Sequence, residues 1–185
     1  MVSLDGFIRH PANIIKLRRM NMKKMILSAA VAVLGLAMAS AAEVPMKLTP
    51  IKDPVTKTSA NTSVAPDGII TVNNKDGKVG GVGCHVNIDQ AAPAKIILSG
   101  ESLCEESLTK SRNPHDYSLY IDLTYTDGTK AYGKITDFDT NVREWQKKSV
   151  ELNEEKAIKQ LRIYILYRNQ TGKVQFKNLK LEEIK

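Results

Sequence analysis

Apolar and polar residues alternate along most of the C-terminal two thirds of the chain, in short runs separated by turn residues. Every second side chain is apolar in residues 117–125, and Asp127-Gly128, a dipeptide typical of hairpin turns, follows directly. Residues 161–168 alternate in the same way. A period of two residues is the pattern of a half-buried β-strand. We therefore expect strands at both segments.

Further apolar runs of strand length precede and follow these two segments. They cover residues 68–72, 82–88, 95–103, 130–136, 144–152 and 174–184. Gly and Asn occur between them, and no stretch after residue 67 carries a long period of 3.6 residues. About eight short, closely spaced strands favour an all-β sandwich or barrel. This fold class is our prediction for residues 68–185.

The N-terminal part has the pattern of an export signal. A short basic start at Met22 precedes a uniformly apolar run at 25–36 and then a series of small residues. Signal peptidase recognises this order, and the apolar run is too short for a comfortable membrane span. We expect a cleavable signal peptide at 22–41, with cleavage after Ala41 or Ala42. The product would be secreted or periplasmic, with no membrane span after cleavage.

Two segments flank this signal. Residues 1–21 are expected to be an upstream extension, with Met22 or Met20 as the true initiator. Residues 42–67 are rich in Pro, Thr, Ser and Lys, which is typical of a linker or a loosely attached first strand.

Most of the net charge belongs to the leader. The chain has 27 Lys and Arg and 20 Asp and Glu, a formal net charge of +7, but residues 1–41 hold six of the basic residues and one of the acidic ones. After the expected cleavage, the net charge is about +2. A nucleic-acid partner requires a basic stripe on the folded domain. We therefore exclude nucleic acid as a partner.

The two cysteines, Cys84 and Cys104, both follow the expected signal peptide. An even count in an oxidising compartment is compatible with one disulfide, and two buried free thiols are the alternative. A hairpin between their strands near 89–94 would place Cys84 closer to Ser99 than to Cys104. A bridge needs Cα atoms within roughly 7 Å, so the sequence leaves both alternatives open.

Several stretches are similar to one known family. Residues 116–129 (DYSLYIDLTYTDGT) resemble a stretch of certain secreted bacterial jelly-roll domains, and 97–102 resemble an earlier strand of the same domains. As in those domains, an acidic residue and Trp follow (Glu144-Trp145), then a strand like 161–168, a Thr-Gly turn and a final strand. On these residues the chain resembles the galactose-binding-domain-like β-sandwiches, which include many bacterial carbohydrate-binding modules. The resemblance implies an antiparallel jelly-roll β-sandwich with a carbohydrate ligand.

Two positions depart from that family. Its members commonly end with an acidic pair, one residue of which helps to bind a structural calcium ion, but Lys177-Asn178 stand in that place here. Asn178 can offer an oxygen, whereas Lys177 brings a positive charge where calcium requires carboxylates. Relatives often carry Trp at the position of Tyr132. We expect no cofactor, and Lys177 argues against calcium.

The sequence shows no recognisable catalytic motif. Its acidic residues form no distinguished pair, and Glu105-Glu106 resemble solvated edges. His85 and His115 are isolated, which argues against a zinc site. No G-x-S-x-G elbow is present, and the glycines of 80–83 open a strand rather than a helix. We expect neither catalytic nor metal-binding residues.

Sugar binding requires exposed aromatic rings, which stack on the C–H faces of pyranose rings, and polar side chains for the hydroxyls. If Ile121 and Ile163 face the core, the other face presents alternate residues of both strands, and Tyr132 and Lys134 would extend it on the hairpin partner. The candidate ligand-binding residues are Tyr120, Asp122, Tyr132, Arg162 and Tyr164. Outward tyrosines also stabilise cross-strand pairs without binding anything. We expect Trp145 in the core.

Two functions follow from these observations. The first is an exported, non-catalytic carbohydrate-binding module that recognises an extracellular or envelope glycan. The alternative is a structural or protein-interaction β-sandwich with no sugar ligand, whose partner would be an envelope protein. The resemblance and the tyrosine face favour the first, and the low aromatic content of 5% favours the second.

Overall fold

The computed structural model describes residues 40–53, 56 and 59–184. The expected upstream extension (1–21) and all but the last two residues of the expected signal peptide (22–41) lie outside these ranges, so both remain predictions.

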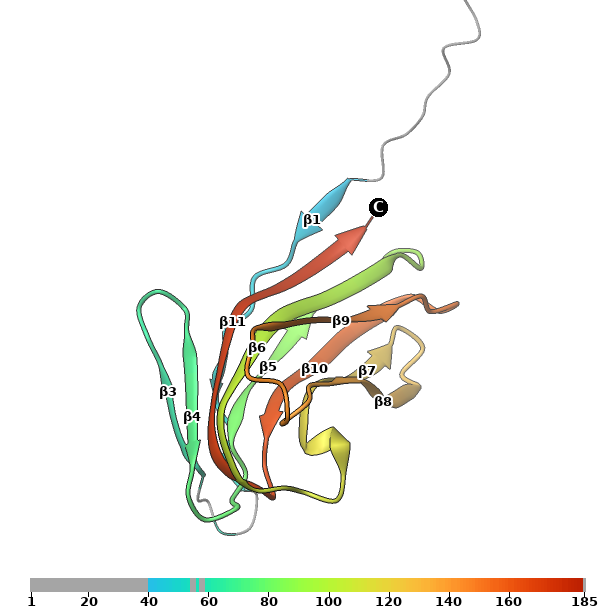
Figure 1. The fold of residues 1–185 in the computed structure, drawn as a ribbon. Helices are drawn as coiled ribbons and strands as arrows, with labels where there is room; N and C mark the ends of the chain where they lie inside the picture. The colour runs from blue at the N-terminus through green and yellow to red at the C-terminus, as the bar shows by residue number, and fades with distance from the viewer. Residues whose placement is uncertain (1–39, 54–55, 57–58, 185) are drawn as a thin grey trace, which may run out of the picture. The chain divides into compact units, whose positions relative to one another are not determined.

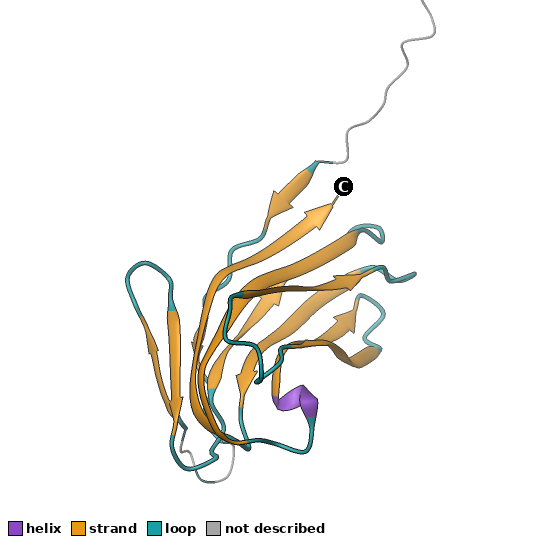
Figure 2. Cartoon of the chain, viewed as in Figure 1, coloured by secondary structure: helices purple, strands orange, loops and turns teal. Residues whose placement is uncertain are grey.

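The described residues form two antiparallel sheets packed face to face (Figures 1 and 2). Sheet A has the strand order β3-β4-β11-β6-β9, with β1 also paired to β11, and sheet B has the order β2-β5-β10-β7-β8. The elements are β1 (Ala41–Glu43), β2 (Thr49–Pro50), β3 (Asn61–Val64), β4 (Ile70–Asn74), β5 (Gly81–Asn87), β6 (Lys95–Thr109), the 3₁₀ turn η1 (Pro114–Asp116), β7 (Tyr117–Tyr125), β8 (Lys130–Asp137), β9 (Gln146–Leu152), β10 (Ile158–Tyr167) and β11 (Thr171–Ile184). The predicted all-β sandwich is confirmed.

The core forms because the alternating strands turn one face of each sheet inward. Ile121 of β7 lies opposite Ile163 of β10, and both side chains are completely buried. Leu98 of β6 and Phe176 of β11 meet them from sheet A and are buried as well. Each such side chain contributes about 1.5–3 kcal/mol of hydrophobic stabilisation. The other face of β7 and β10 is thereby turned toward solvent.

The connection from β5 to β6 corrects one expectation. These strands do not form a hairpin, because β5 belongs to sheet B and β6 to sheet A. Buried Gln90 fixes the crossing between the sheets. Its side-chain oxygen accepts a hydrogen bond from Ile158 N at 2.9 Å, and its amide nitrogen donates to Glu183 Oε1 at 3.0 Å. The sequence marks a turn near residues 89–94, but it does not show which strand pairs with which. Long-range hydrogen bonds such as those of Gln90 determine that pairing.

The cysteines lie on these two strands, Cys84 on β5 and Cys104 on β6. Both are free and buried. Burial raises the pKa of the Cys84 thiol to about 11 and also raises the pKa of Cys104. The two thiols of the structure are therefore protonated near neutral pH.

Polar segments extend the sandwich beyond the predicted strands. Strand β6 continues past Leu103 to Thr109, because Lys173 of β11 pairs with Glu105 at 2.6 Å and Thr171 bonds Thr109 at 2.8 Å. Residues 42–67 contribute β2 and β3 and most of β1, so this segment reaches both sheets.

Candidate ligand-binding face

Two tyrosines lie side by side on the outer face of sheet B. Tyr120 of β7 is directly opposite Tyr164 of β10. Their ring centroids are 6.0 Å apart, and the ring planes are inclined by 60°. Both rings are half-buried. They lie on the face of the sheet opposite to the core-facing side chains of Ile121 and Ile163. Tyr120 and Tyr164 thus point away from the core, as the sequence predicts.

A pair of opposite charges continues this face. Asp122 of β7 lies opposite Arg162 of β10. The Asp122 carboxylate accepts a hydrogen bond from Gly133 N at 3.2 Å and another from the Tyr120 hydroxyl. Burial, together with this bond and the Asp122 charge, raises the pKa of Tyr120. The arrangement fixes an acceptor beside a guanidinium, which is the kind of polar pair that orients hydroxyl groups.

Tyr132 lies at the edge of the face, and 65% of it is exposed. The register shifts between Ile121 and Leu123, which leaves Tyr132 and Gly133 together opposite Asp122. This bulge corrects the expectation for Lys134. Lys134 lies opposite Ile121 and therefore on the core side of the sheet instead of the outer face. Its ammonium pairs with Glu154 at 2.7 Å. A one-residue insertion inverts the side-chain alternation of an edge strand.

Three adjoining hollows run across this outer face. The first, of about 290 Å³, lies between strand β2 and Tyr164; the second, of about 400 Å³, lies over Tyr164, Tyr120 and Asp122. The third, of about 20 Å³, lies between Asp122, Arg162 and Tyr132. Tyr164 is shared by the first two and Asp122 by the last two. The structure thus brings all five predicted residues together along one surface.

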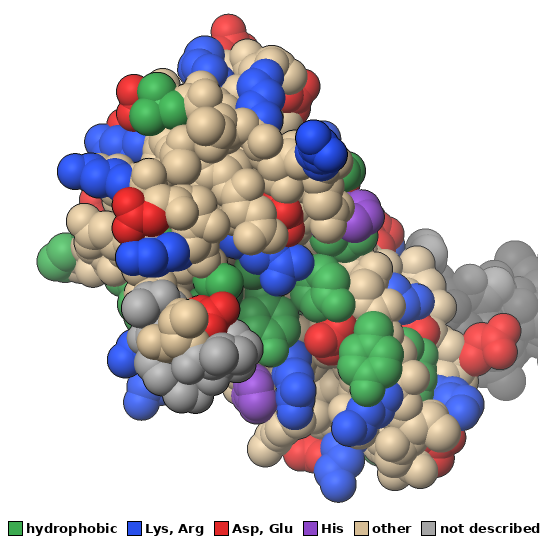
Figure 3. Space-filling view, turned by 90° about the horizontal axis from the view of Figure 1, so that it is seen from below, with side chains coloured by type: hydrophobic (Ala, Val, Ile, Leu, Met, Phe, Trp, Pro, Cys, Tyr) green, Lys and Arg blue, Asp and Glu red, His purple; other side chains and the backbone are tan. Residues whose placement is uncertain are grey.

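Several lining residues were not predicted. Arg168 and Leu166 continue the outward alternation of β10, so the period of two could have found them. Ile51 and Lys52 come from the segment after β2, where no periodicity marks them. Figure 3 shows one face of the molecule, on which hydrophobic side chains gather near the middle with basic and acidic side chains among them.

The outer face of sheet A is different, because ion pairs and a stacked tryptophan occupy it. Lys177 Nζ lies 3.8 Å from the centre of the Trp145 ring and 3.5 Å from Glu101 Oε2. Trp145 is half-exposed, which corrects its expected place in the core. The tryptophan precedes β9 at the sheet edge, and the aliphatic stem and ammonium of Lys177 cover its ring.

Lys177 and Asn178 lie where the family resemblance would place a structural calcium ion, and Glu101 contacts both. Asn178 donates its amide to Glu101 Oε1 at 3.0 Å, and the Lys177 ammonium lies beside the other carboxylate oxygen. Calcium requires several free oxygens. Glu101 is already neutralised and Asn178 presents a donor, so these residues do not fit a calcium ion. In the described part of the chain, no group of three His, Cys, Asp or Glu side chains could hold a metal.

The described residues include no helix that is long and apolar enough to cross a membrane.

The sequence matches no protein-family model and none of the curated protein sequences. Several solved structures similar to this chain are, or contain, carbohydrate-binding modules. One is a family 16 carbohydrate-binding module, at 16% identity and a TM-score of 0.47, covering 66% of this chain and 85% of the other. Another is the xylan-binding domain CBM22-1 of a Paenibacillus barcinonensis protein, at 10% identity and a TM-score of 0.44, covering 77% and 96%. A third contains the CBM22-1 and GH10 modules of a Clostridium thermocellum xylanase complexed with xylohexaose, at 12% identity and a TM-score of 0.44, covering 77% and 26%. At these values the likeness says nothing about which ligand this chain binds.

Proposed function

We propose that this chain is an exported, non-catalytic carbohydrate-binding module that binds an extracellular or envelope glycan along the outer face of sheet B. The ligand would lie across Tyr164 and Tyr120 and end near Tyr132, with Asp122 and Arg162 bonding its hydroxyls. The sandwich would be of the jelly-roll type. Export would place the protein outside the cell or in the periplasm, after removal of the leader at 22–41.

The continuity of the three hollows carries this proposal. Tyr164 lines two of them and Asp122 lines two, so the three hollows adjoin one another along the face. An extended surface of this kind suits a chain of sugar units better than a single small molecule. Tyrosine rings, a carboxylate and a guanidinium along it supply both the apolar faces and the polar partners that sugars require.

The arrangement of the two rings favours the alternative function. Tyr120 and Tyr164 are tilted against each other and half-buried, which is also how a cross-strand aromatic pair stabilises a sheet. In that case the face would be structural, and an envelope protein would be the partner.

A glycan array of the purified full chain tests the proposal. We expect one glycan class to be retained, and we expect a Tyr120→Ala, Tyr164→Ala double variant to lose it while keeping its circular dichroism spectrum. The matched Tyr120→Phe, Tyr164→Phe variant keeps both rings and should retain most of the binding. Failure of the parent chain to retain any glycan would favour the structural alternative.

A further inference from the structure

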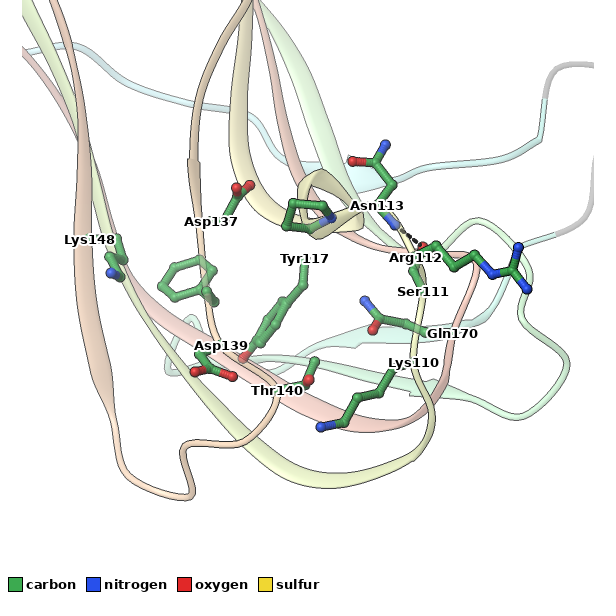
Figure 4. A pocket seen from close by; sticks show the side chains of 12 residues that line it. Lys110, Ser111, Arg112, Asn113, Tyr117, Asp137, Asp139, Thr140, Lys148 and Gln170 are labelled. Atoms are coloured by element: carbon green, nitrogen blue, oxygen red, sulfur yellow. Dashed lines mark hydrogen bonds between the residues drawn. The ribbon is translucent and has the colours of Figure 1, made fainter.

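A second cavity lies at one end of the sandwich, apart from the face described above. Its volume is about 390 Å³, within the roughly 300–1,000 Å³ range of small-molecule sites. It is bordered by the segment 110–114 before β7, by the end of β8 and the residues that follow it (137–140), and by Lys148 of β9 (Figure 4). Buried Tyr117 and Phe138 form its apolar wall. The cavity shares no lining residue with the hollows of sheet B.

A buried amide points into this cavity. Gln170, in the turn between β10 and β11, is only 3% exposed, and Figure 4 shows its side chain directed toward Tyr117 and Lys110. The structure gives this amide no hydrogen-bond partner within the described residues. Among the described side chains only the Ser107 hydroxyl is both fully buried and without a partner, so the Gln170 amide is open to the cavity, where a ligand bearing hydroxyl groups can bond it.

Two lysines border the cavity, and both lie close enough to Asp139 for their charges to lower its pKa. Lys148 has the register of the core-facing residues of β9, yet its ammonium forms no ion pair within the described residues. The Lys110 ammonium donates only to Asn141 Oδ1. Both cations border the cavity, and Figure 4 shows Lys148 across it from Gln170.

The two carboxylates of the cavity are differently placed. Both oxygens of Asp137 lie 3.1 Å from His115 Nδ1. Asp139 Oδ1 accepts two hydrogen bonds of 2.7 Å from Asn141, and these bonds, together with the charges of Lys110 and Lys148, hold the pKa of Asp139 below its usual value. Asp139 therefore stays ionised and can accept a ligand hydroxyl through Oδ2. It would repel a bare anion that filled the same space.

We propose that this end cavity binds a small hydroxylated carboxylate of the uronate class. The carboxylate of the ligand lies between Lys110 and Lys148, and its hydroxyls bond the Gln170 amide and Asp139. A neutral sugar would leave the two lysines without a carboxylate from the ligand, and a simple carboxylate would leave Gln170 and Asp139 without hydroxyl partners. The cavity is thus a second site, whose ligand need not be the glycan of the sheet B face.

A titration of the full chain with sodium D-glucuronate, followed by amide NMR, tests this site. We expect saturable shifts at the side-chain amide of Gln170, with D-glucose and sodium acetate each binding at least tenfold more weakly. Lys148→Ala should weaken glucuronate binding tenfold or more, whereas Lys159→Ala, an exposed lysine on β10, should leave it unchanged. Gln170→Glu, which keeps the shape but adds a negative charge, should abolish it. Tyr120→Ala, in the other site, should have no effect.

Three results would overturn the proposal. One is the absence of any shift at Gln170 with glucuronate. Another is equal binding of glucose or acetate, which would mean that the two sets of groups do not act together. The third is an equal response of Lys148→Ala and Lys159→Ala, both of which are exposed substitutions that leave the core intact.

Discussion

Gly83 of β5 lies directly opposite Tyr164 of β10, and a methyl group on Gly83 would lie 3.0 Å from the Ile163 carbonyl oxygen and 3.1 Å from Tyr164 Cδ1. The missing side chain therefore gives the tyrosine ring its place on the outer face. It also keeps open the hollow beside strand β2, which Gly83 and Tyr164 both line.

This contact predicts the effect of Gly83→Ala. The added methyl should displace the Tyr164 ring and reduce glycan binding about tenfold, at a stability cost of about 1–3 kcal/mol from overpacking. Isothermal titration of both proteins with the glycan found on the array would measure the loss. In a Tyr164→Ala background the same substitution should cause no further loss. A loss of equal size in that background would show that Gly83 acts elsewhere.

Asp122 should control the ionisation of Tyr120. Burial raises the pKa of the Tyr120 phenol, and the hydrogen bond and charge of Asp122 raise it further. Asp122→Asn removes the charge but keeps the shape, so the pKa of Tyr120 should fall toward its usual value of 10.0 without reaching it. An ultraviolet phenolate titration, with Tyr120→Phe to assign the transition, would detect the change. An unaltered transition would contradict the hydrogen bond.

Buried Asp116 should make the sandwich sensitive to acid. Burial alone would raise its pKa, but hydrogen bonds from Ser111, Asn169 and Arg168 outweigh burial and hold the pKa below 3.8. A carboxylate with a lowered pKa stabilises the fold above its unfolded pKa, and this stabilisation is lost as the pH falls through the folded value. The loss should therefore occur below about pH 4.

The matched variant is Asp116→Asn. It should lower the free energy of unfolding by about 1–3 kcal/mol at pH 7, because three donors lose a charged acceptor. It should also weaken the dependence of stability on pH below about pH 4. Urea denaturation at pH 7 and at pH 3 would measure both. Equal acid sensitivity of parent and variant would assign that sensitivity to other groups.

Gly172 should tolerate no side chain. Its φ is +141°, and a Cβ there would overlap the carbonyl oxygen of Glu106 on β6. We expect Gly172→Ala to destabilise the fold by about 2–4 kcal/mol, through strain and a displaced strand pair. Gly128→Ala is the matched control, since Gly128 also has a positive φ of +82° but no neighbour within 4 Å. Thermal unfolding should show a clearly smaller loss for Gly128→Ala.

The thiols should react slowly in the native protein. Cys84 and Cys104 are buried, and the raised pKa of about 11 for Cys84 leaves little thiolate at pH 8. A thiol reagent should find two reactive groups in denaturant without reductant and almost none beforehand. Finding no thiols in denaturant would mean that a disulfide forms in the isolated protein.

The sequence predicts the fold and most of the outer face because the relevant information is local. Strict alternation in β7 and β10 is enough to turn Tyr120, Asp122, Arg162 and Tyr164 away from the core. The place of Lys134 could not be predicted in this way, because the bulge at Tyr132 and Gly133 inverts the alternation of β8 without any change in apolar pattern.

Long-range pairing accounts for the rest. Ile51 reaches the outer face of sheet B because its backbone N–H donates to Gly81 O. The pattern of apolar and polar residues does not predict this contact. The end cavity needs Lys148 of sheet A to meet Gln170 from the turn after β10, and only the stacking of the two sheets brings them together. The sequence predicts Trp145 in the core, but the Lys177 side chain covers its ring at the surface.

The pairing of β1 with the end of β11 has a consequence for the chain's connectivity. Ala41 lies opposite Ile184, so the first strand runs antiparallel beside the end of the last one (Figure 1). A short link could therefore join Ile184 to Ala41, and the same strands could then follow one another along the chain in a different order. A circular permutant, joined by a short linker from Ile184 to Ala41 and opened in the exposed turn at Asp127-Gly128, should keep every strand pair of both sheets.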